Sequence, residues 1–276
     1  MNKIMPELPE ITVLNRQMAK EITGKHIHEV EVCQPKCLNI PPEQFVETAV
    51  SKAIGQIYSR GKWLFIKLKP DYNLLINLGM GADLLYFKPS SKLPEKYQFK
   101  LTFAEHSGFT IRFYWFGYIH LLHEKELNQH KLTAKLGISP LDKEFTKQYL
   151  VKLLEKRKAR IKSLLMDQKN IAGIGNVYIQ DILFNARLHP NRKANSLSDQ
   201  EISDLYDAIK NVLNSSIKKG GLAYEKNFYG QKGNFGTEDF RVGYKTGEPC
   251  PVCFAPIEKI RTGSTSSYIC PKCQKL

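Results

Sequence analysis

Four cysteines near the end of the chain restrict its fold more than any other feature of the sequence. They form two pairs, Cys250 with Cys253 and Cys270 with Cys273, and 16 residues separate the pairs. Each pair can occupy one tight turn, and two such turns supply four thiolates to one tetrahedral Zn²⁺. Such a site has no open coordination position, so we expect one structural zinc rather than a catalytic one. Metal binding would supply the folding energy of this short tail.

The first half of the chain carries the pattern of one helix followed by strands. Residues 9–23 put apolar side chains on one helical face, and Gly24 follows as a stop signal. From about residue 26 to 125, short apolar runs separated by turns predict the strands of a sandwich or barrel. The clearest runs are residues 27–32, 63–68, 74–78, 99–103 and 109–116. No helical pattern alternates with these runs, so we expect no parallel sheet.

The chain becomes helical after Pro140. Apolar residues keep helical spacing there, and Ser198 with Glu201 has the form of a capping box that opens an amphipathic helix. The two glycines at 220–221 would end this helix. Residues 222–241 are rich in Gly, Tyr and Phe without periodicity, which is typical of a loop. Together these patterns predict an α+β fold.

The charge of the chain favours a polyanionic partner. Its 276 residues include 41 Lys and Arg against 27 Asp and Glu, a formal net charge of +14. Such a surplus favours nucleic acid, and less often an acidic membrane surface; a merely basic protein is the alternative. No stretch approaches 18 apolar residues and no apolar signal core is present, so we expect a cytoplasmic protein without a membrane segment. In that compartment we interpret Cys33 and Cys37 as ordinary thiols.

A basic stretch beside a glycine-containing turn predicts contacts with DNA phosphates. Seven basic residues crowd this helical stretch, opposed only by Glu155 and Asp167: Lys152, Lys156, Arg157, Lys158, Arg160, Lys162 and Lys169. The alternative is a solvated helix face. The turn Gly-Ile-Gly-Asn at 173–176 directly precedes a helical segment at 177–184, and small residues there let the backbone approach a phosphate. The combination favours a clamp on the DNA backbone.

The segment Met-Pro-Glu-Leu-Pro-Glu at residues 5–10 offers an unusual nucleophile. If Met5 is the initiator and is removed, Pro6 becomes a terminal secondary amine, which can attack a sugar C1′ and form an iminium ion. An α-amino group is partly neutral at physiological pH, whereas a lysine hardly is. Glu7 would act as general acid on the sugar ring oxygen or relay a proton. The alternative for Glu7 and Glu10 is the ordinary chemistry of a helix start.

The order of these motifs resembles the formamidopyrimidine-DNA glycosylase/endonuclease VIII family over nearly the whole chain. Besides residues 5–10, the resemblance rests on Arg60-Gly61-Lys62-Trp63, Asn77-Leu78-Gly79-Met80-Gly81, Leu136-Gly137, Pro140-Leu141, residues 162–168, 173–178 and 186–190, and Cys270-Pro271-Lys272-Cys273-Gln274. It implies an antiparallel β-sandwich with an N-terminal helix, a helix–two-turn–helix domain and a zinc β-ribbon, with DNA in the cleft between. The expected parts are an extension at 1–4, a catalytic sandwich domain at 5–135, a helical DNA-binding domain at 142–221, a lesion-capping loop at 222–241 and a zinc ribbon at 244–276.

The resemblance also implies a bifunctional enzyme. It would flip a damaged base out of duplex DNA, cleave the glycosidic bond and nick the strand by β-elimination. Pro6 looks like the Schiff-base nucleophile, Glu7 like the acid and Lys62 like the proton donor of the β-elimination. The expected partner is double-stranded DNA with a damaged base or an abasic site, the expected cofactor is one structural Zn²⁺, and the expected state is a monomer.

Five further residues look like DNA-binding residues of this family. Met80 looks like the apolar wedge that fills the gap left by the flipped base, and Lys158 and Asn176 look like phosphate ligands. Trp115 stands before Phe116 where the family carries an arginine, and an indole can stack on the orphan base.

Two other features depart from the family pattern. Thr265 stands where the family carries a ribbon arginine that grips the phosphate beside the lesion, so we expect a weakened phosphate contact and impaired δ-elimination. Arg261, four residues earlier, is the candidate to replace this arginine, but four residues along a ribbon strand are a displacement of about a dozen ångströms. Residues 1–4 precede Met5, where the family begins, and a start codon assigned too early is the simplest account.

The leading hypothesis is a base excision repair DNA glycosylase and abasic-site (AP) lyase that acts on oxidised bases. The alternative is a catalytically silent protein of the same fold that binds DNA damage or junctions and whose N-terminus is blocked by residues 1–4. A zinc-ribbon nucleic-acid adaptor without base flipping is a remoter third. Glu7, Glu10 and Lys62 favour the enzyme, because a pure binding protein has no evident need of them.

Overall fold

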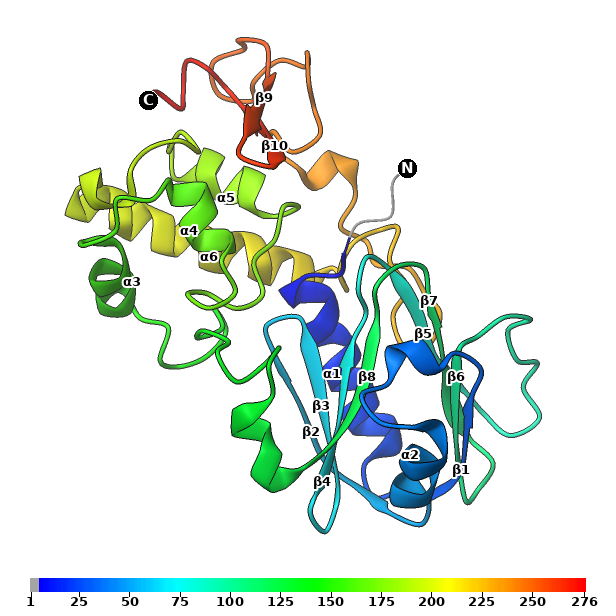
Figure 1. Ribbon diagram of the computed structural model, residues 1–276. Coiled ribbons are helices and arrows are strands. Elements are labelled where there is room, and N and C mark those ends of the chain that lie inside the picture. Colours follow the sequence, from blue (N-terminus) through cyan, green and yellow to red (C-terminus); the bar gives the residue numbers. More distant parts are fainter. Residues whose placement is uncertain (1–4) are drawn as a thin grey trace. The chain divides into compact units, whose positions relative to one another are not determined.

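The computed structural model describes residues 5–276, and the expected extension at residues 1–4 lies outside the described residues. The chain forms two compact units (Figure 1). The first contains the residues up to Lys135 together with Gly220–Asn234, and the second contains Leu136–Lys219 and Phe235–Leu276. Within residues 5–276, no helix is both long enough and apolar enough to span a membrane.

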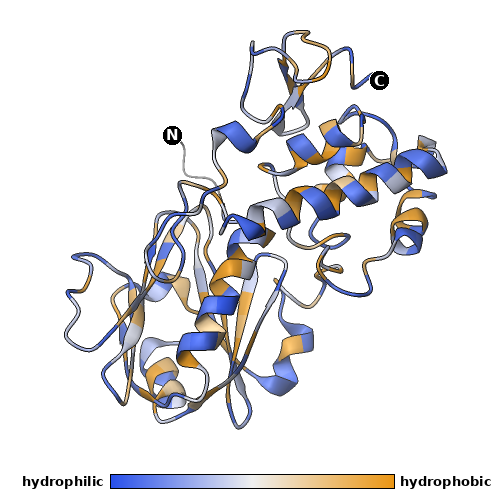
Figure 2. Cartoon of the chain, turned by 180° about the vertical axis from the view of Figure 1, so that it is seen from behind, coloured by the Kyte–Doolittle hydropathy of each residue, from blue (hydrophilic) through white to orange (hydrophobic). Residues whose placement is uncertain are grey.

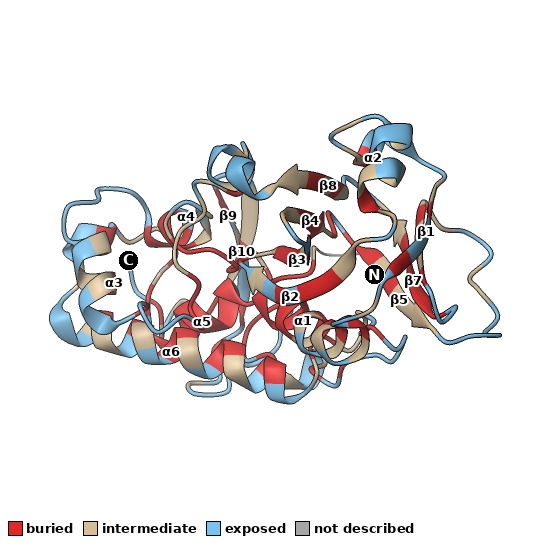
Figure 3. Cartoon of the chain, turned by 90° about the horizontal axis from the view of Figure 1, so that it is seen from below, coloured by how far each residue is buried: buried red, intermediate tan, exposed pale blue. Residues whose placement is uncertain are grey.

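The first unit is a sandwich of two four-stranded sheets, as the sequence predicts. One sheet has the strand order β1-β6-β7-β5 and the other β2-β3-β4-β8, and neighbouring strands in each are antiparallel. The strands are β1 (Ile27–Val32), β2 (Ala53–Arg60), β3 (Trp63–Lys69), β4 (Tyr72–Asn77), β5 (Ala82–Phe87), β6 (Phe99–Phe103), β7 (Gly108–Phe113) and β8 (Tyr118–His123). Apolar residues of both sheets share one buried core, and Figure 3 shows buried residues along strands such as β2 and β7.

Helix α1 (Leu8–Ile22) opens the described chain and packs against β2 and β3. Its side chains Ile11, Leu14 and Met18 recur every three or four residues and are buried in the sandwich core. Gly24 follows the helix with a φ of +85°, a conformation that favours glycine, so the predicted helix and its stop signal are confirmed.

Two local features of the first unit differ from the strand pattern. Residues Pro42–Ala49 form helix α2, which begins with a proline and buries Phe45 and Ala49 on one face. The predicted strand at 109–116 is too long, because β7 ends at Phe113. The chain then turns back through Phe116, whose φ is +49°, and short 3₁₀ turns lie at Pro35–Cys37 and Glu124–Gln129.

The segment Gly220–Asn234 lies along helix α1. The Leu222 N–H donates to the Glu10 Oε1 at 3.1 Å, and the Phe228 N–H donates to the Gln17 Oε1 at 2.9 Å. One turn further along the helix, Glu21 accepts from the Tyr229 hydroxyl at 2.7 Å. Residues 10, 17 and 21 share one helical face, so the segment is attached to α1 over three of its turns.

The second unit combines helices with the terminal ribbon. Its described elements are α3 (Lys147–Leu154), α4 (Ile161–Met166), α5 (Ile179–Asn185), α6 (Asp199–Lys218), β9 (Glu258–Thr262) and β10 (Thr265–Ile269), with 3₁₀ turns at Ala194–Ser196 and Thr237–Asp239. The predicted capping box opens α6, because the Ser198 N–H donates to the Glu201 Oε2 at 2.9 Å and the Glu201 N–H donates to the Ser198 Oγ at 3.3 Å. Hydrophilic and hydrophobic residues alternate along this helix, as its amphipathic pattern predicts (Figure 2).

Candidate active site and zinc centre

The segment before α1 and the turn between β2 and β3 bring the three expected catalytic residues into one region of the first unit. Pro6 is buried, and Glu7, the N-cap residue of α1, is 1 % exposed. The half-buried Lys62 donates through its Nζ to the Met5 Sδ at 3.7 Å. An ammonium group therefore lies next to the residue that precedes Pro6.

The position of Lys62 is fixed by its own turn and by Asn77 at the end of β4. Gly61 has a φ of +59°, which lets the chain reverse between β2 and β3. The Asn77 Nδ2 donates to the Lys62 carbonyl oxygen at 3.0 Å, and the Asn77 Oδ1 accepts from the Gly79 N–H at 3.0 Å. One amide side chain thus joins the Lys62 turn to the loop that carries Met80.

Glu10 has a structural role that the sequence reveals only in part. Its Oε2 accepts from the Glu7 N–H at 3.0 Å, which is the helix-start bond expected of a first-turn carboxylate. Its Oε1 accepts from the Leu222 N–H at 3.1 Å. Glu10 is 5 % exposed, so this buried carboxylate joins the Pro6-Glu7 segment to the segment beginning at Gly220.

Replacing Glu10 with Gln is expected to lower the free energy of unfolding by about 1–3 kcal/mol, because the amide NH₂ would face one of the two N–H donors. Urea unfolding measures the change. Arg16→Gln, at an exposed position of the same helix, is the matched control and should stay within about 0.5 kcal/mol of the wild type. Equal stability of E10Q and the wild type would show that the Glu10 bridge contributes nothing.

Met80, Trp115 and Phe116 form an exposed apolar group in the first unit, with exposed fractions of 44 %, 63 % and 71 %. The Met80 N–H donates to the Trp115 carbonyl oxygen at 2.9 Å, which joins the loop after β4 to the turn between β7 and β8. Gly79 has a φ of +55°, and a Cβ there would come within 2.1 Å of the same carbonyl oxygen. The close approach of the two loops therefore requires a glycine.

Lys158 is exposed in the second unit, but the basic stretch around it is not helical. The sequence predicts a basic helix there, and this prediction is wrong, because α3 ends at Leu154 and α4 begins only at Ile161. Between them the Ala159 carbonyl oxygen accepts from the Ala194 N–H at 2.9 Å, so the segment pairs with another part of the chain.

Asn176 is half-buried before α5, which begins two residues later than predicted. The Gln180 Nε2 donates to the Asn176 carbonyl oxygen at 2.8 Å and to its Oδ1 at 3.1 Å. The Asn176 side chain is therefore oriented from within α5.

Two cations near the ribbon differ from their sequence-based interpretations. Lys162, which the sequence groups with the basic stretch predicted to contact DNA phosphates, is 2 % exposed. Arg261 was expected about a dozen ångströms from Thr265. That distance applies along one strand, whereas the chain reverses between β9 and β10. In the observed register Thr265 pairs with Thr262 and Ser266 pairs with Arg261, so Arg261 is only one residue pair away from Thr265, on the opposite face of the hairpin.

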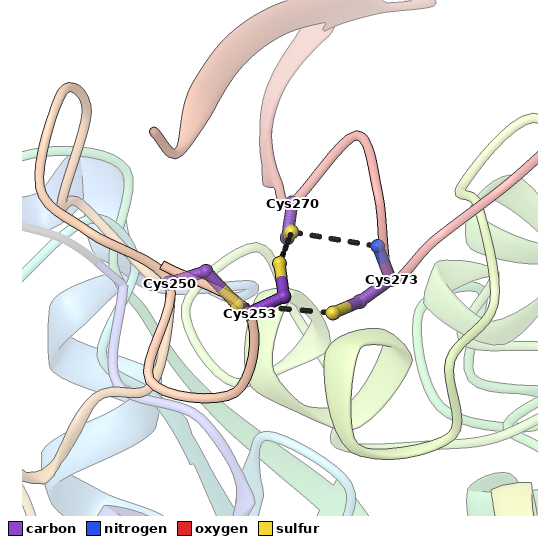
Figure 4. Close-up of side chains that lie close together, drawn as sticks. All are labelled: Cys250, Cys253, Cys270 and Cys273. Atoms are coloured by element: carbon purple, nitrogen blue, oxygen red, sulfur yellow. Dashed lines mark hydrogen bonds between the residues drawn. The ribbon is translucent and has the colours of Figure 1, made fainter. Parts of the chain in front are cut away.

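The four ribbon cysteines form one cluster in the second unit (Figure 4). Their Sγ atoms all lie within 4.8 Å of one another, with 3.3 Å between Cys253 and Cys270 and 3.8 Å between Cys250 and Cys273. A tetrahedral Zn²⁺ with Zn–S bonds of about 2.3 Å requires sulfurs about 3.8 Å apart, so this donor set fits zinc. All four positions of such a site are protein ligands, so the zinc is structural, as the sequence predicts.

Three family models match the chain in order. They are the formamidopyrimidine-DNA glycosylase N-terminal domain over residues 5–114, the formamidopyrimidine-DNA glycosylase H2TH domain over residues 136–227 and the zinc finger found in FPG and IleRS over residues 247–276. The formamidopyrimidine-DNA glycosylase of Pelotomaculum thermopropionicum is 38 % identical, covering 99 % of this chain and 100 % of the relative. That of Chloroflexus aurantiacus is 36 % identical, covering 98 % of both.

Solved structures agree with these matches. The structure of Lactococcus lactis Fpg in complex with DNA containing N7-benzyl-Fapy-dG has a TM-score of 0.89 and 29 % identity, covering 98 % of this chain and 100 % of that chain. The complex of the Lactococcus lactis Fpg with DNA containing an abasic site has a TM-score of 0.89 and 28 % identity, with the same coverage. The chain belongs to the formamidopyrimidine-DNA glycosylase family, as its sequence motifs predict.

Proposed function

We propose that this chain is a DNA glycosylase with AP lyase activity that removes oxidised bases from duplex DNA in base excision repair. The observation that carries the proposal is the Lys62 Nζ at 3.7 Å from the Met5 Sδ, next to the buried Pro6 and Glu7. A protein that only binds DNA has no evident use for this combination. The relatives named formamidopyrimidine-DNA glycosylase support the same activity.

The proposed chemistry requires Pro6 to be the first residue of the chain. Its secondary amine attacks the sugar C1′, the glycosidic C1′–N bond breaks, and the base leaves with a proton. Glu7 protonates the ring oxygen as the C1′–O4′ bond opens, which leaves an iminium ion between Pro6 and C1′. Loss of a C2′ proton then breaks the C3′–O bond with Lys62 as the proton donor, and water releases Pro6.

The DNA-binding residues of the proposal lie on both units. Met80, Trp115 and Phe116 would fill the gap left by the flipped base, because exposed apolar side chains can enter the base stack. Lys158 and Asn176 would bind backbone phosphates, and the zinc ribbon would hold its own phosphate contacts in shape. We further propose that the protein acts as a monomer on chromosomal DNA in the cytoplasm, in keeping with its net charge of +14.

Borohydride reduction during reaction with a duplex that contains an oxidised base tests the proposal. Protein that begins at Pro6 should form a covalent adduct, and Lys62→Ala should lower nicking by roughly 10²-fold or more. Lys96→Ala, at an exposed position between β5 and β6, is the control and should behave as the wild type.

The Glu7→Gln variant separates the two activities. It should lose base release, because the ring oxygen lacks its acid, and it should still nick a preformed abasic site. The absence of an adduct with every oxidised or abasic duplex would contradict the proposed function.

A further inference from the structure

A single carboxylate of β5 joins two segments that lie far apart in the sequence. Asp83 belongs to β5, which pairs with β7 (Figure 1). Its Oδ2 accepts from the Tyr114 hydroxyl at 2.8 Å and from the Lys226 Nζ at 3.1 Å. One oxygen atom therefore contacts both the chain after β7 and the segment Gly220–Asn234, which belongs to the same compact unit.

Tyr114 forms the start of the turn that carries Trp115 and Phe116. Its N–H donates to the Gly81 carbonyl oxygen at 3.0 Å, and the guanidinium carbon of Arg112 lies 5.1 Å from the centre of its ring. The next two residues are the exposed apolar side chains that we propose to fill the gap left by the flipped base. A movement of Trp115 therefore also moves the backbone of Tyr114, because the two residues are adjacent in the chain.

Lys226 opens a small hairpin in the second of these segments. It pairs with Lys232 in an antiparallel bridge, and both lysines are exposed. The Phe228 carbonyl oxygen accepts from the Tyr86 N–H at 2.7 Å, and the Phe228 side chain is buried in the sandwich core. The hairpin is therefore anchored through Phe228, while Lys226 connects it to Asp83. It lies within residues 222–241, the expected lesion-capping loop.

The burial of Asp83 strengthens both of its contacts. Its side chain is 16 % exposed, and that of Lys226 is 39 % exposed. An ion pair between fully exposed groups contributes little, but a mostly covered carboxylate is screened less by water and salt. The Tyr114 hydroxyl donates to a charged acceptor, which makes a stronger hydrogen bond than a neutral one. Loss of either contact leaves a mostly covered charge less well compensated, so the two contacts depend on each other.

We propose that Asp83 is a positioning residue that couples the insertion of Trp115 and Phe116 into the base stack to the closure of the Lys226 hairpin over the flipped base. The proposal rests on the glycosylase function proposed above and on the expected capping role of residues 222–241. Two segments that bind one carboxylate oxygen favour one joint arrangement, so each stabilises the ordered state of the other. An abasic sugar carries no base for the hairpin to cover. The coupling should therefore matter for base release and not for nicking of a preformed abasic site.

The Lys226→Met variant tests the coupling in a protein that begins at Pro6. Single-turnover base release is measured on duplexes with 8-oxoguanine or thymine glycol, whichever the wild type cleaves faster. The variant should release the base about 5- to 10-fold more slowly and should nick a preformed abasic site within about twofold of the wild type. Lys232→Met is the matched control, because it removes the same charge from the other strand of the hairpin. It should stay within about twofold on both substrates.

The Tyr114→Phe variant removes the other contact of Asp83 and keeps the aromatic ring. It should slow base release by a similar factor, about 5- to 10-fold, and leave nicking of the abasic duplex unchanged. The double variant with Lys226→Met should stay within about twofold of the slower single variant, because both contacts act through one carboxylate. Independent roles of the two residues would instead multiply the two losses.

Tryptophan fluorescence measures the coupling at the other end of the network. The chain has two tryptophans, of which Trp63 is buried and Trp115 is exposed, so a change on DNA binding comes mainly from Trp115. Stacking on bases should quench Trp115 when the protein is mixed with the oxidised duplex. Lys226→Met should slow or reduce this quenching, although Lys226 belongs to another segment, and Lys232→Met should leave it unchanged. A merely local role of Lys226 would not alter the signal of Trp115.

Three results would overturn the proposal: K226M releasing the base as fast as K232M, equal losses on the oxidised and the abasic duplex, or multiplied losses in the double variant. Thermal unfolding of each variant verifies its fold. Because both lysines are exposed, their comparison decides the matter even where Tyr114→Phe does not fold. Wild-type protein that releases no base from any oxidised duplex would contradict the proposed function instead, and the fluorescence comparison would still decide the coupling.

Discussion

A chain that begins at Pro6 is expected to form a covalent, borohydride-stable adduct with abasic-site DNA, and a chain that retains residues 1–5 is expected to form none. In the longer chain the Pro6 nitrogen belongs to an amide, whose lone pair is delocalised into the carbonyl group of Met5. It therefore cannot attack C1′, and adduct formation should fall by roughly 10³-fold or more.

The measurement compares adduct formation by two protein preparations that differ only in residues 1–5, and the intact mass of each preparation verifies its N-terminus. Thermal unfolding of both is the control for folding. The match to the family's N-terminal domain begins at residue 5, in keeping with Pro6 as the first residue of the active form. Equal adduct formation by both preparations would assign the nucleophile to another amine, and Lys62 would be the first to test.

Replacing Cys253 with Ser is expected to remove the zinc and to lower affinity for abasic DNA by about 10²-fold or more, because the proposed phosphate contacts of the ribbon require it to be folded. Buried Cys250 and Cys270 belong to the small apolar cluster of the ribbon, together with Ile257. A structural zinc contributes about 10–16 kcal/mol in small zinc-finger peptides, more than a cluster of this size can supply. The ribbon should unfold while the sandwich stays intact.

Metal analysis of the purified protein and amide hydrogen exchange of β9 and β10 measure this outcome. Cys33→Ser is the matched control, because Cys33 is an exposed thiol of the first unit, and it should keep one zinc per chain and the wild-type affinity. Full zinc content in C253S, or tight DNA binding by zinc-free protein, would contradict the structural role of the metal.

The features that the sequence predicts well are those set by neighbouring residues. The helix at 9–23, the capping box of Ser198 and Glu201 and the strand at 99–103 each depend on a short pattern of apolar, capping or turn residues. The cysteine cluster follows the same logic, because two residues between cysteines already define each half of the site.

The features that the sequence does not predict depend on contacts between distant segments. The sequence shows Lys162 only as one member of a basic run. Its side chain is buried because the oxygen atoms that accept its hydrogen bonds belong to residues about a hundred positions later. Glu10 reads as a helix-start residue, and its second partner, Leu222, follows more than two hundred residues later. A charged residue on a solvated face and a charged residue buried by distant partners have the same local sequence pattern, so the spacing of residues alone cannot distinguish them. Gln180, which carries no motif, was missed for the same reason.

The side chain of Asn77 connects two parts of the proposed active site. It holds the Lys62 carbonyl oxygen with one end and the Gly79 N–H with the other. A displacement of the Met80 loop would therefore also reach the turn that carries Lys62. If Met80 enters the base stack as proposed, its displacement and the position of Lys62 are coupled through this one amide group.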